Sequence, residues 1–357
     1  MEQRIEREDH TEHQVDLGQV TRYMEVTEAR ENHVWGRIRE PLKQSLAQLK
    51  QVFRDNGFTA YFRRHGQGHE IVYGPPRELR PSRLWVNLLL FVGTVLTTLA
   101  VGTLQAGHNP LNLLNWVHGI PFSVSIILIL GSHELGHYFT ARRLGVDATL
   151  PYFLPVPHPM TGTMGAFIRI KSPVPSKGAL VKVGVSGPLV GFLVALPVTF
   201  IGLGMSRTVS LGEAQGGIQL GSSFVFWLLS LARFGSLPEG VDVMLHPMAF
   251  AGWLGLFVTA LNLLPVGQLD GGHIAYAVFG RWRRAANWVI VAVLLLMGFF
   301  WLGWPFWAVL ISIFGMRHPP PLDDITPLNG TEKMLAVVAL LLLVLTFMPA
   351  PFGSVRI

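Results

Sequence analysis

The sequence predicts a polytopic α-helical membrane protein with about six transmembrane helices, short re-entrant or interfacial segments, a membrane-associated β-hairpin and a small N-terminal α+β soluble domain. Three observations support this prediction. Hydrophobic residues make up 50% of the 357 residues and charged residues only 14%, against roughly 25% charged residues in an ordinary soluble domain. More than half of the charged residues precede residue 84. Several apolar runs after that point approach the about 20 residues of a spanning helix.

The charge distribution divides the chain into four segments: a flexible tail over 1–18, a small α+β domain over 19–76, a linker over 77–83 and a transmembrane domain over 84–357. Within the α+β domain, apolar residues at three- and four-residue steps predict an amphipathic helix inside Glu40–Gly57. Two β-rich runs, FTAYFRR and HEIVYG, flank the turn sequence HGQG and predict a hairpin. A further strand is expected near Tyr23–Val26.

Hydropathy gives the candidate spans of the transmembrane domain. They are Leu84–Leu104, Ile120–Thr140, Leu180–Met205, Met248–Leu264, Ala285–Trp301 and Met334–Phe347. Two further apolar runs, Ser222–Ala232 and Phe306–Met316, are too short to cross upright. Lys and Arg gather where the odd-numbered spans begin and the even-numbered spans end, which favours an amino terminus on the cytoplasmic side. The start, MEQRIEREDH, is too polar for a cleaved signal peptide.

Composition also limits the chemistry and the partners. The chain has no cysteine, which excludes disulfides and thiolate metal ligands, so a metal would be held by His, Asp or Glu. The net charge of +6 comes mostly from basic residues at the ends of hydrophobic runs. We interpret it as membrane topology and expect no nucleic-acid partner.

The second predicted span contains the pattern H-E-x-x-H as His133, Glu134 and His137. Residues four apart lie on one helix face, so both imidazoles can bind one metal ion while Glu134 reaches the water to be activated. The short pattern occurs by chance in many proteins. Ionisable groups inside an apolar span cost free energy unless they have partners, so a functional site is favoured over polar residues packed between helices.

Two imidazoles leave a catalytic zinc site one protein ligand short. Asp270, in the sequence ALNLLPVGQLDGGH, follows an apolar helix that Pro265 and Gly267 interrupt. Irregular backbone at membrane depth is tolerated where it lines protein or a water-filled cavity. Asp270 is therefore the candidate third ligand; a helix-end cap is the alternative role, and His273 is a rival ligand nearer the surface.

These motifs together resemble the site-2 protease family of intramembrane zinc metalloproteases. The resemblance rests on HELGH at His133–His137, NLLPVGQLDGGH at Asn262–His273, SGPLVG at Ser186–Gly191, and their order. It implies that His133, His137 and Asp270 bind one Zn²⁺ per chain, that Glu134 is the general base, and that Asn262 lies beside the active site as a substrate-binding residue. The N-terminal domain and the PPPLDDITPL stretch resemble the branch with a soluble domain before the first span. The sequence between the second and fourth spans leaves no room for a PDZ insertion of the size that some relatives carry there.

The run PYFLPVPHPMTGTMGAFIRIKSP resembles the family's membrane-associated β-hairpin. Its part GTMGAFIRI alternates as a strand does, and a free strand edge can pair with an extended peptide. Gly165 and Phe167 are the candidate substrate-binding residues there, and an ordinary turn is the alternative.

The resulting hypothesis is regulated intramembrane proteolysis: a single-span membrane protein unwinds near the metal and is cleaved by water that Glu134 activates. The expected location is a bacterial-type inner or plasma membrane, as a multi-pass protein. A metal transporter is the main alternative; a catalytically silent membrane protein, and a zinc protease with a glutamate third ligand, are disfavoured. The physiological substrate, the oligomeric state and the role of the N-terminal domain do not follow from the sequence.

Overall fold

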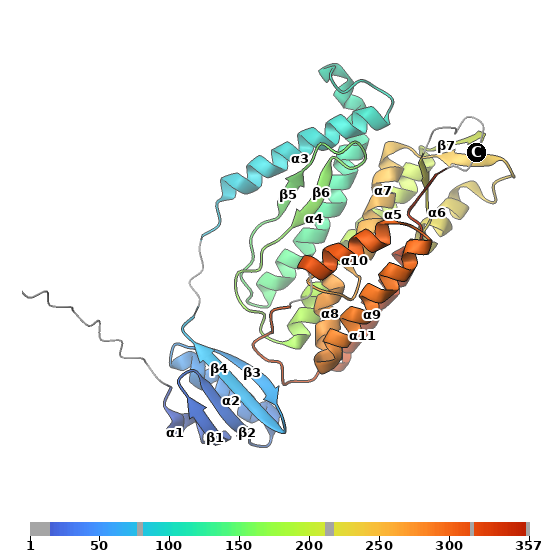
Figure 1. Cartoon of the computed structure of the whole chain (residues 1–357). Coiled ribbons are helices and arrows are strands. Elements are labelled where there is room, and N and C mark those ends of the chain that lie inside the picture. The colour runs from blue at the N-terminus through green and yellow to red at the C-terminus, as the bar shows by residue number, and fades with distance from the viewer. Residues whose placement is uncertain (1–14, 77–80, 211–217, 315–317, 355–357) are drawn as a thin grey trace, which may run out of the picture. The chain divides into compact units, whose positions relative to one another are not determined.

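The computed structural model describes residues 15–76, 81–210, 218–314 and 318–354 (Figure 1). Residues 1–14 of the predicted tail and 77–80 of the predicted linker lie outside these ranges. The chain forms two compact units. The N-terminal unit contains the chain up to residue 78 together with Pro321–Thr326, and the helical unit contains the rest.

The N-terminal unit is a four-stranded antiparallel sheet with strand order β1-β2-β4-β3 and one long helix packed on it. Its elements are α1 (Leu17–Val20), β1 (Met24–Arg30), β2 (His33–Ile38), α2 (Leu42–Asp55), β3 (Thr59–His65) and β4 (Gly68–Gly74). The amphipathic helix is confirmed as α2, whose Leu46, Leu49 and Phe53 are buried in the shared core. The hairpin is confirmed as β3 and β4, joined at Gly66 with a φ of 56°.

The segment Pro321–Thr326, from the loop between the last two long helices, completes the N-terminal unit at the edge strand β3. Phe62 donates its N–H to Leu322 O at 2.7 Å, and the N–H of Asp324 donates to Phe62 O at 3.0 Å. Ile325 is fully buried in the core of the unit. The sequence analysis placed this segment with the transmembrane domain. Nothing in its residue types indicates that it adds to a strand so far away in the chain.

The same segment carries a buried ion pair. The carboxylate of Asp323 lies 2.6 Å from Nζ of Lys50 and accepts hydrogen bonds from the N–H and the hydroxyl of Thr326. Burial alone would raise the pKa of Asp323. The hydrogen bonds from Lys50 and Thr326 outweigh burial and hold the pKa below its ordinary value. The segment is therefore fastened by backbone pairing, an apolar anchor and a charge.

In the helical unit, three helices of the described residues are long and apolar enough to cross a membrane. They are α3 (Leu84–Gln105), the continuous η1 (Leu113–Gly119) with α4 (Ile120–Arg143), and α5 (Lys177–Gly204). They coincide with the first three predicted spans. The shorter helices are α6 (Phe224–Phe234), α7 (Pro247–Asn262), α8 (Asp270–Phe279), α9 (Arg283–Leu296), α10 (Gly303–Phe314) and α11 (Gly330–Thr346), with turns η2 (Gly280–Trp282) and η3 (Met297–Phe299). The total of about six spans stays a prediction.

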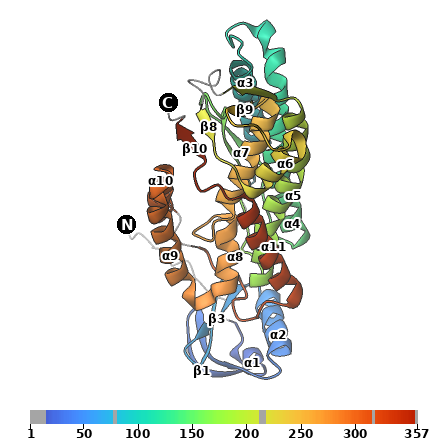
Figure 2. The same cartoon turned by 90° about the vertical axis from the view of Figure 1, so that its right-hand side faces the viewer.

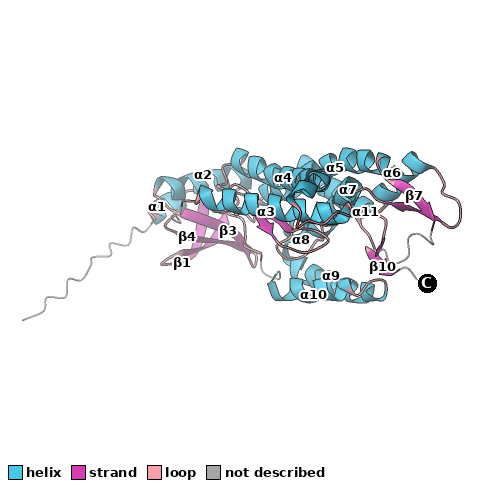
Figure 3. Cartoon of the chain, turned by 90° about the horizontal axis from the view of Figure 1, so that it is seen from above, coloured by secondary structure: helices cyan, strands magenta, loops and turns pink. Residues whose placement is uncertain are grey.

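The helices α4, α5 and α7 lie side by side and form the centre of the helical unit (Figures 1 and 2). Small residues allow the close approach: a Cβ at Gly136 of α4 would lie 2.7 Å from the backbone oxygen of Ser186 on α5, and one at Gly255 of α7 would lie 2.8 Å from Ile129. The helices α9 and α10 pair with each other in a separate layer (Figures 2 and 3). The site is built on the central helices.

The predicted hairpin is present as the antiparallel strands β5 (Tyr152–Pro155) and β6 (Thr163–Phe167). Gly162 precedes β6 with a φ of 66°, and a Cβ there would lie 2.9 Å from the backbone of Thr97 on α3. In the described part of the chain, β6 pairs with β5 alone, so its other edge is free of strands. The remaining strands are β7 (Arg207–Ser210), β8 (Ile218–Leu220), β9 (Val241–Met244) and β10 (Phe352–Ser354).

Candidate metal centre

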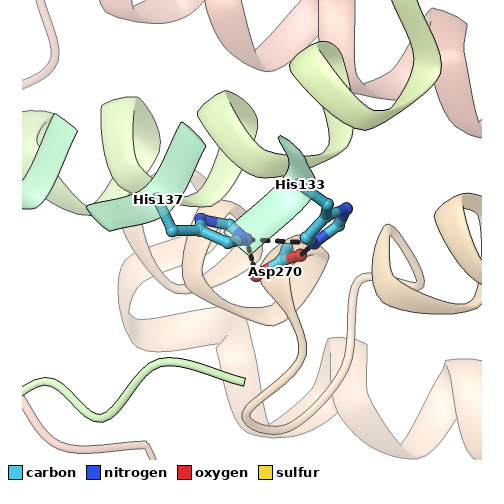
Figure 4. Close-up of side chains that lie close together, drawn as sticks. All are labelled: His133, His137 and Asp270. Atoms are coloured by element: carbon cyan, nitrogen blue, oxygen red, sulfur yellow. Dashed lines mark hydrogen bonds and ion pairs between the residues drawn. The ribbon is translucent and has the colours of Figure 1, made fainter. Parts of the chain in front are cut away.

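Three side chains from helices far apart in the sequence converge on one point (Figure 4). His133 and His137 project from α4, and Asp270 projects from the first turn of α8. Nε2 of His133 lies 3.2 Å from Oδ2 of Asp270, and Nε2 of His137 lies 3.2 Å from Oδ1. The two Nε2 atoms are 3.1 Å apart. The structure therefore brings together the three residues that the sequence analysis proposed as ligands.

The spacing of these atoms fits one zinc ion. Tetrahedral zinc with bonds of about 2.0 to 2.2 Å places neighbouring ligand atoms about 3.3 to 3.6 Å apart, close to the observed 3.1 to 3.2 Å. Two nitrogen lone pairs facing each other repel unless a proton or a cation lies between them. Three protein ligands also leave a fourth position open, as catalytic zinc sites require. The donor set thus suits a catalytic rather than a purely structural ion.

The helix α5 makes room for both imidazoles through glycines of the SGPLVG motif. A Cβ at Gly187 would overlap Nε2 of His137, and a Cβ at Gly191 would lie 3.1 Å from Cβ of His133. The sequence analysis used this motif only as part of the family resemblance. The structure adds that its glycines lie directly against the side chains of His133 and His137.

Hydrogen bonds orient the two imidazoles. Nδ1 of His137 lies 2.8 Å from Val183 O, so the ring donates through Nδ1 and leaves the Nε2 lone pair for a metal. Asn262, the last residue of α7, places its Nδ2 3.3 Å from Nε2 of His133. The amide of Asn262 therefore lies at the site itself, as the resemblance implied.

The backbone between α7 and α8 positions Asp270. After Asn262 the chain turns through Gly267, which has a φ of 65°. A Cβ at Gly271 would overlap Leu263 O, so only glycine lets α8 start this close to the end of α7. A carboxylate in the first helical turn is also favoured by the helix dipole. The interrupted helix that the sequence predicted is what turns Asp270 toward the two histidines.

Glu134 lies beside the metal ligands but faces the hairpin. Its side chain is buried, and its Oε2 accepts a hydrogen bond of 2.7 Å from the N–H of Ile168. Ile168 directly follows β6. The sequence analysis missed this contact, because a backbone N–H leaves no trace in residue type; the strand-like alternation of GTMGAFIRI was the only signal near it.

Of the three predicted substrate-binding residues, Asn262 lies beside His133, whereas Gly165 and Phe167 lie on β6. Gly165 has a φ of 101°, a conformation that favours glycine. Phe167 is 46% exposed and its ring stacks on Tyr152 of β5. Both residues are near Ile168 in the chain, so they lie on the strand that leads to Glu134.

His273, the rival ligand, does not join the cluster. Its Nδ1 contacts Nε2 of His318, and the group of described residues that could hold a metal ion consists of His133, His137 and Asp270. His273 therefore belongs to the packing between α8 and the chain before α11.

Comparisons with known proteins identify a peptidase family and several similar zinc metalloproteases. Residues 121–302 match the model of peptidase family M50. The chain is 34% identical over 241 residues to the probable zinc metalloprotease EGY2, chloroplastic, of Arabidopsis thaliana, across 66% of this chain and 42% of that protein. It is 34% identical over 259 residues to the probable zinc metalloprotease EGY3, chloroplastic, of Oryza sativa subsp. indica, across 66% of this chain and 43% of that protein.

A longer alignment, to the probable zinc metalloprotease EGY1, chloroplastic, of Oryza sativa subsp. japonica, covers 94% of this chain and 63% of that protein at 26% identity. The chain thus spans well under half the length of the curated relatives that it matches at higher identity. No solved structure was found to match it.

Proposed function

The chain belongs to peptidase family M50, the site-2 protease family, and from this premise we propose that it is a membrane zinc endopeptidase acting within or near the transmembrane segments of its substrates. The convergence of His133, His137 and Asp270 beside the carboxylate of Glu134, on apolar helices, carries this proposal. A membrane location is consistent with the three membrane-length helices.

In the proposed mechanism His133, His137 and Asp270 hold one zinc ion per chain. Zinc bound there would polarise the scissile carbonyl and make water acidic enough to be activated. Glu134 takes a proton from the attacking water and delivers it to the departing amine. Asn262, whose Nδ2 lies 3.3 Å from Nε2 of His133, would donate a hydrogen bond to the substrate or to the reacting oxygen. The distances of 3.1 to 3.2 Å among His133, His137 and Asp270 support this mechanism.

The free edge of β6 is the proposed binding strand for an unwound substrate. A helical substrate hides its amides in its own hydrogen bonds, whereas an extended one can pair with a strand edge. Gly165 leaves its side of the strand open, since nothing lies within 4 Å of a Cβ there, and Phe167 offers an exposed ring to an apolar side chain. The contact from Ile168 to Glu134 brings such a strand next to the base.

The proposed partners are single-span membrane proteins in a lipid bilayer. We further propose a bacterial-type inner or plasma membrane, with the N-terminal unit in the cytoplasm, because basic residues gather on the side where α3 and α5 begin and α4 ends. On this topology the metal centre is reached by water from the cytoplasmic side.

The test combines metal analysis with cleavage of a single-span substrate by the purified full chain. We expect Glu134→Gln to abolish cleavage while keeping zinc. Asp270→Ala should lose both cleavage and zinc, because Asp270 is a proposed zinc ligand and Glu134 is not. Glu70→Gln, in the N-terminal unit, is the matched control and should change neither. Cleavage by Glu134→Gln would contradict the assigned base, and metal flux across vesicles that survives this substitution would favour transport instead.

A further inference from the structure

An apolar groove is lined mainly by residues of α8 and α11 of the helical unit, two helices labelled in Figure 2. Its volume is about 600 Å³, within the range of ligand pockets. One face of each helix forms its walls, and Leu263 and Pro265 close its inner side. The lining also includes Ile274, Ala275, Val278, Ala336, Val337, Leu340 and Leu343. Val337 and Leu340 are more than half exposed, so the groove opens toward the surroundings of the protein.

Two lysines stand at one end of this groove. Lys177 is the first residue of α5, and Lys333 lies in the first turn of α11; both line the groove. The first turns of the two helices touch, because a Cβ at Gly178 would overlap the carboxylate of Glu332. Both lysines therefore lie at the same end, and the lining beyond them is almost wholly apolar. The mouth of the groove holds these two lysines beside the carboxylate of Glu332, whose charge is balanced by Lys182 at 3.1 Å, and its interior is apolar.

The length of the groove matches one leaflet of a membrane. From Lys333 to Leu343 the wall of α11 rises about 15 Å, at about 1.5 Å per residue, which is half of the roughly 30 Å hydrocarbon core. The lysines then lie at the level of lipid headgroups. Anionic headgroups are what cations at this level attract.

The polarity of the groove disfavours an extended peptide. An extended peptide would fit but would leave backbone N–H and C=O groups without partners, since the walls are apolar side chains of helices. An acyl chain has no such groups.

We propose that the groove between α8 and α11 binds an anionic phospholipid, with an acyl chain along Val337 and Leu340 and the phosphate at Lys177 and Lys333. The site is distinct from the metal centre, although Gly271 of its lining is next to Asp270 in the chain. The proposal requires the helical unit to lie in a bilayer and does not require peptidase activity.

The experiment reconstitutes the full chain in vesicles of equal phosphatidylglycerol and phosphatidylcholine, extracts it in mild detergent and counts retained phospholipids by native mass spectrometry. We expect the wild type to retain phosphatidylglycerol preferentially. Each lysine near an anionic lipid strengthens binding about fivefold. The double variant Lys177→Gln with Lys333→Gln should therefore reduce the preference for phosphatidylglycerol by about 25-fold. The matched control, Arg143→Gln with Arg284→Gln, removes two exposed cations outside the groove and should leave the preference intact.

Two further variants separate the possible occupants. Ala336→Trp fills the groove and should reduce retention of both lipids. Since the chain has no cysteine, Val337→Cys provides a single thiol for a photocrosslinker, and the mass of its adduct identifies the occupant. A phospholipid adduct supports the proposal. Three results would overturn it. The wild type could retain both lipids equally, the double lysine variant could keep the preference for phosphatidylglycerol, or the thiol could form its adduct with an added single-span peptide.

Discussion

The glycines of α5 decide whether two histidines can face one ion. Gly187 and Gly191 leave the space that His137 and His133 fill, and Val183 O fixes the ring of His137 through Nδ1. In the proposed site the histidines supply two ligand atoms, and the neighbouring helix determines where those atoms point. Substitutions that touch no ligand should therefore still remove the metal.

Gly187→Ala tests this directly. Because the added methyl would overlap Nε2 of His137, we expect zinc affinity to fall at least tenfold, the size of effect seen when ligand orientation is disturbed. Gly131→Ala on α4 is the matched control, since its Cβ would lie 3.6 Å from the nearest ring atom. Zinc content of the two purified variants decides the matter, and equal occupancy would show that α5 does not position the ring.

The segment Pro321–Thr326 is expected to hold β3 in place. The side chain of Asp323 is only 3% exposed, so Lys50→Met would leave a buried carboxylate without its cation. Removing one partner of a buried ion pair lowers the free energy of unfolding by about 3 kcal/mol. Hydrogen exchange of the β3 amides in the full chain should accelerate accordingly. Lys43→Met, an exposed position on α2, should leave exchange unchanged, and equal acceleration in both variants would contradict the role of the pair.

Acid should loosen the same contact. The pKa of Asp323 is lowered in the folded protein from its ordinary value of 3.8, so its stabilising contribution is present above that value and is lost as the pH falls through the folded pKa. We expect the difference in β3 hydrogen-exchange protection between wild type and Asp323→Asn to shrink below about pH 4. A difference that stays constant down to pH 2 would show that the carboxylate does not stabilise the segment through its charge.

Sequence patterns predicted the features that depend on residues close together in the chain, such as the faces and the ends of helices. The spacing of HELGH placed His133 and His137 on one helix face, and Pro265 with Gly267 signalled the interruption that directs Asp270. The pairing of Phe62 with residues 322 and 324 could not be predicted, because backbone hydrogen bonds between distant segments do not depend on residue type. The contact from Ile168 to Glu134 escaped for the same reason. Helix lengths after α5 were also uncertain, since apolar composition alone does not fix where a helix ends.

The metal is expected to act as a cross-link within the helical unit, because it joins α4 to α8 across more than a hundred residues of chain. Binding to the folded state alone adds free energy of unfolding, about 2.7 kcal/mol when free zinc is a hundred times its dissociation constant. Chelation should therefore lower the unfolding temperature of the helical unit and abolish cleavage together.

The N-terminal unit should not respond to the same treatment, because its core and the segment Pro321–Thr326 contain none of the metal ligands. Hydrogen exchange can follow both units in one sample: chelation should accelerate exchange around α4 and α8 while β3 and β4 keep their protection. Asp270→Ala is the control, since a chain that holds no zinc has none to lose and should be insensitive to the chelator. If chelation destabilised wild type and Asp270→Ala equally, the ion would not be bridging the two helices.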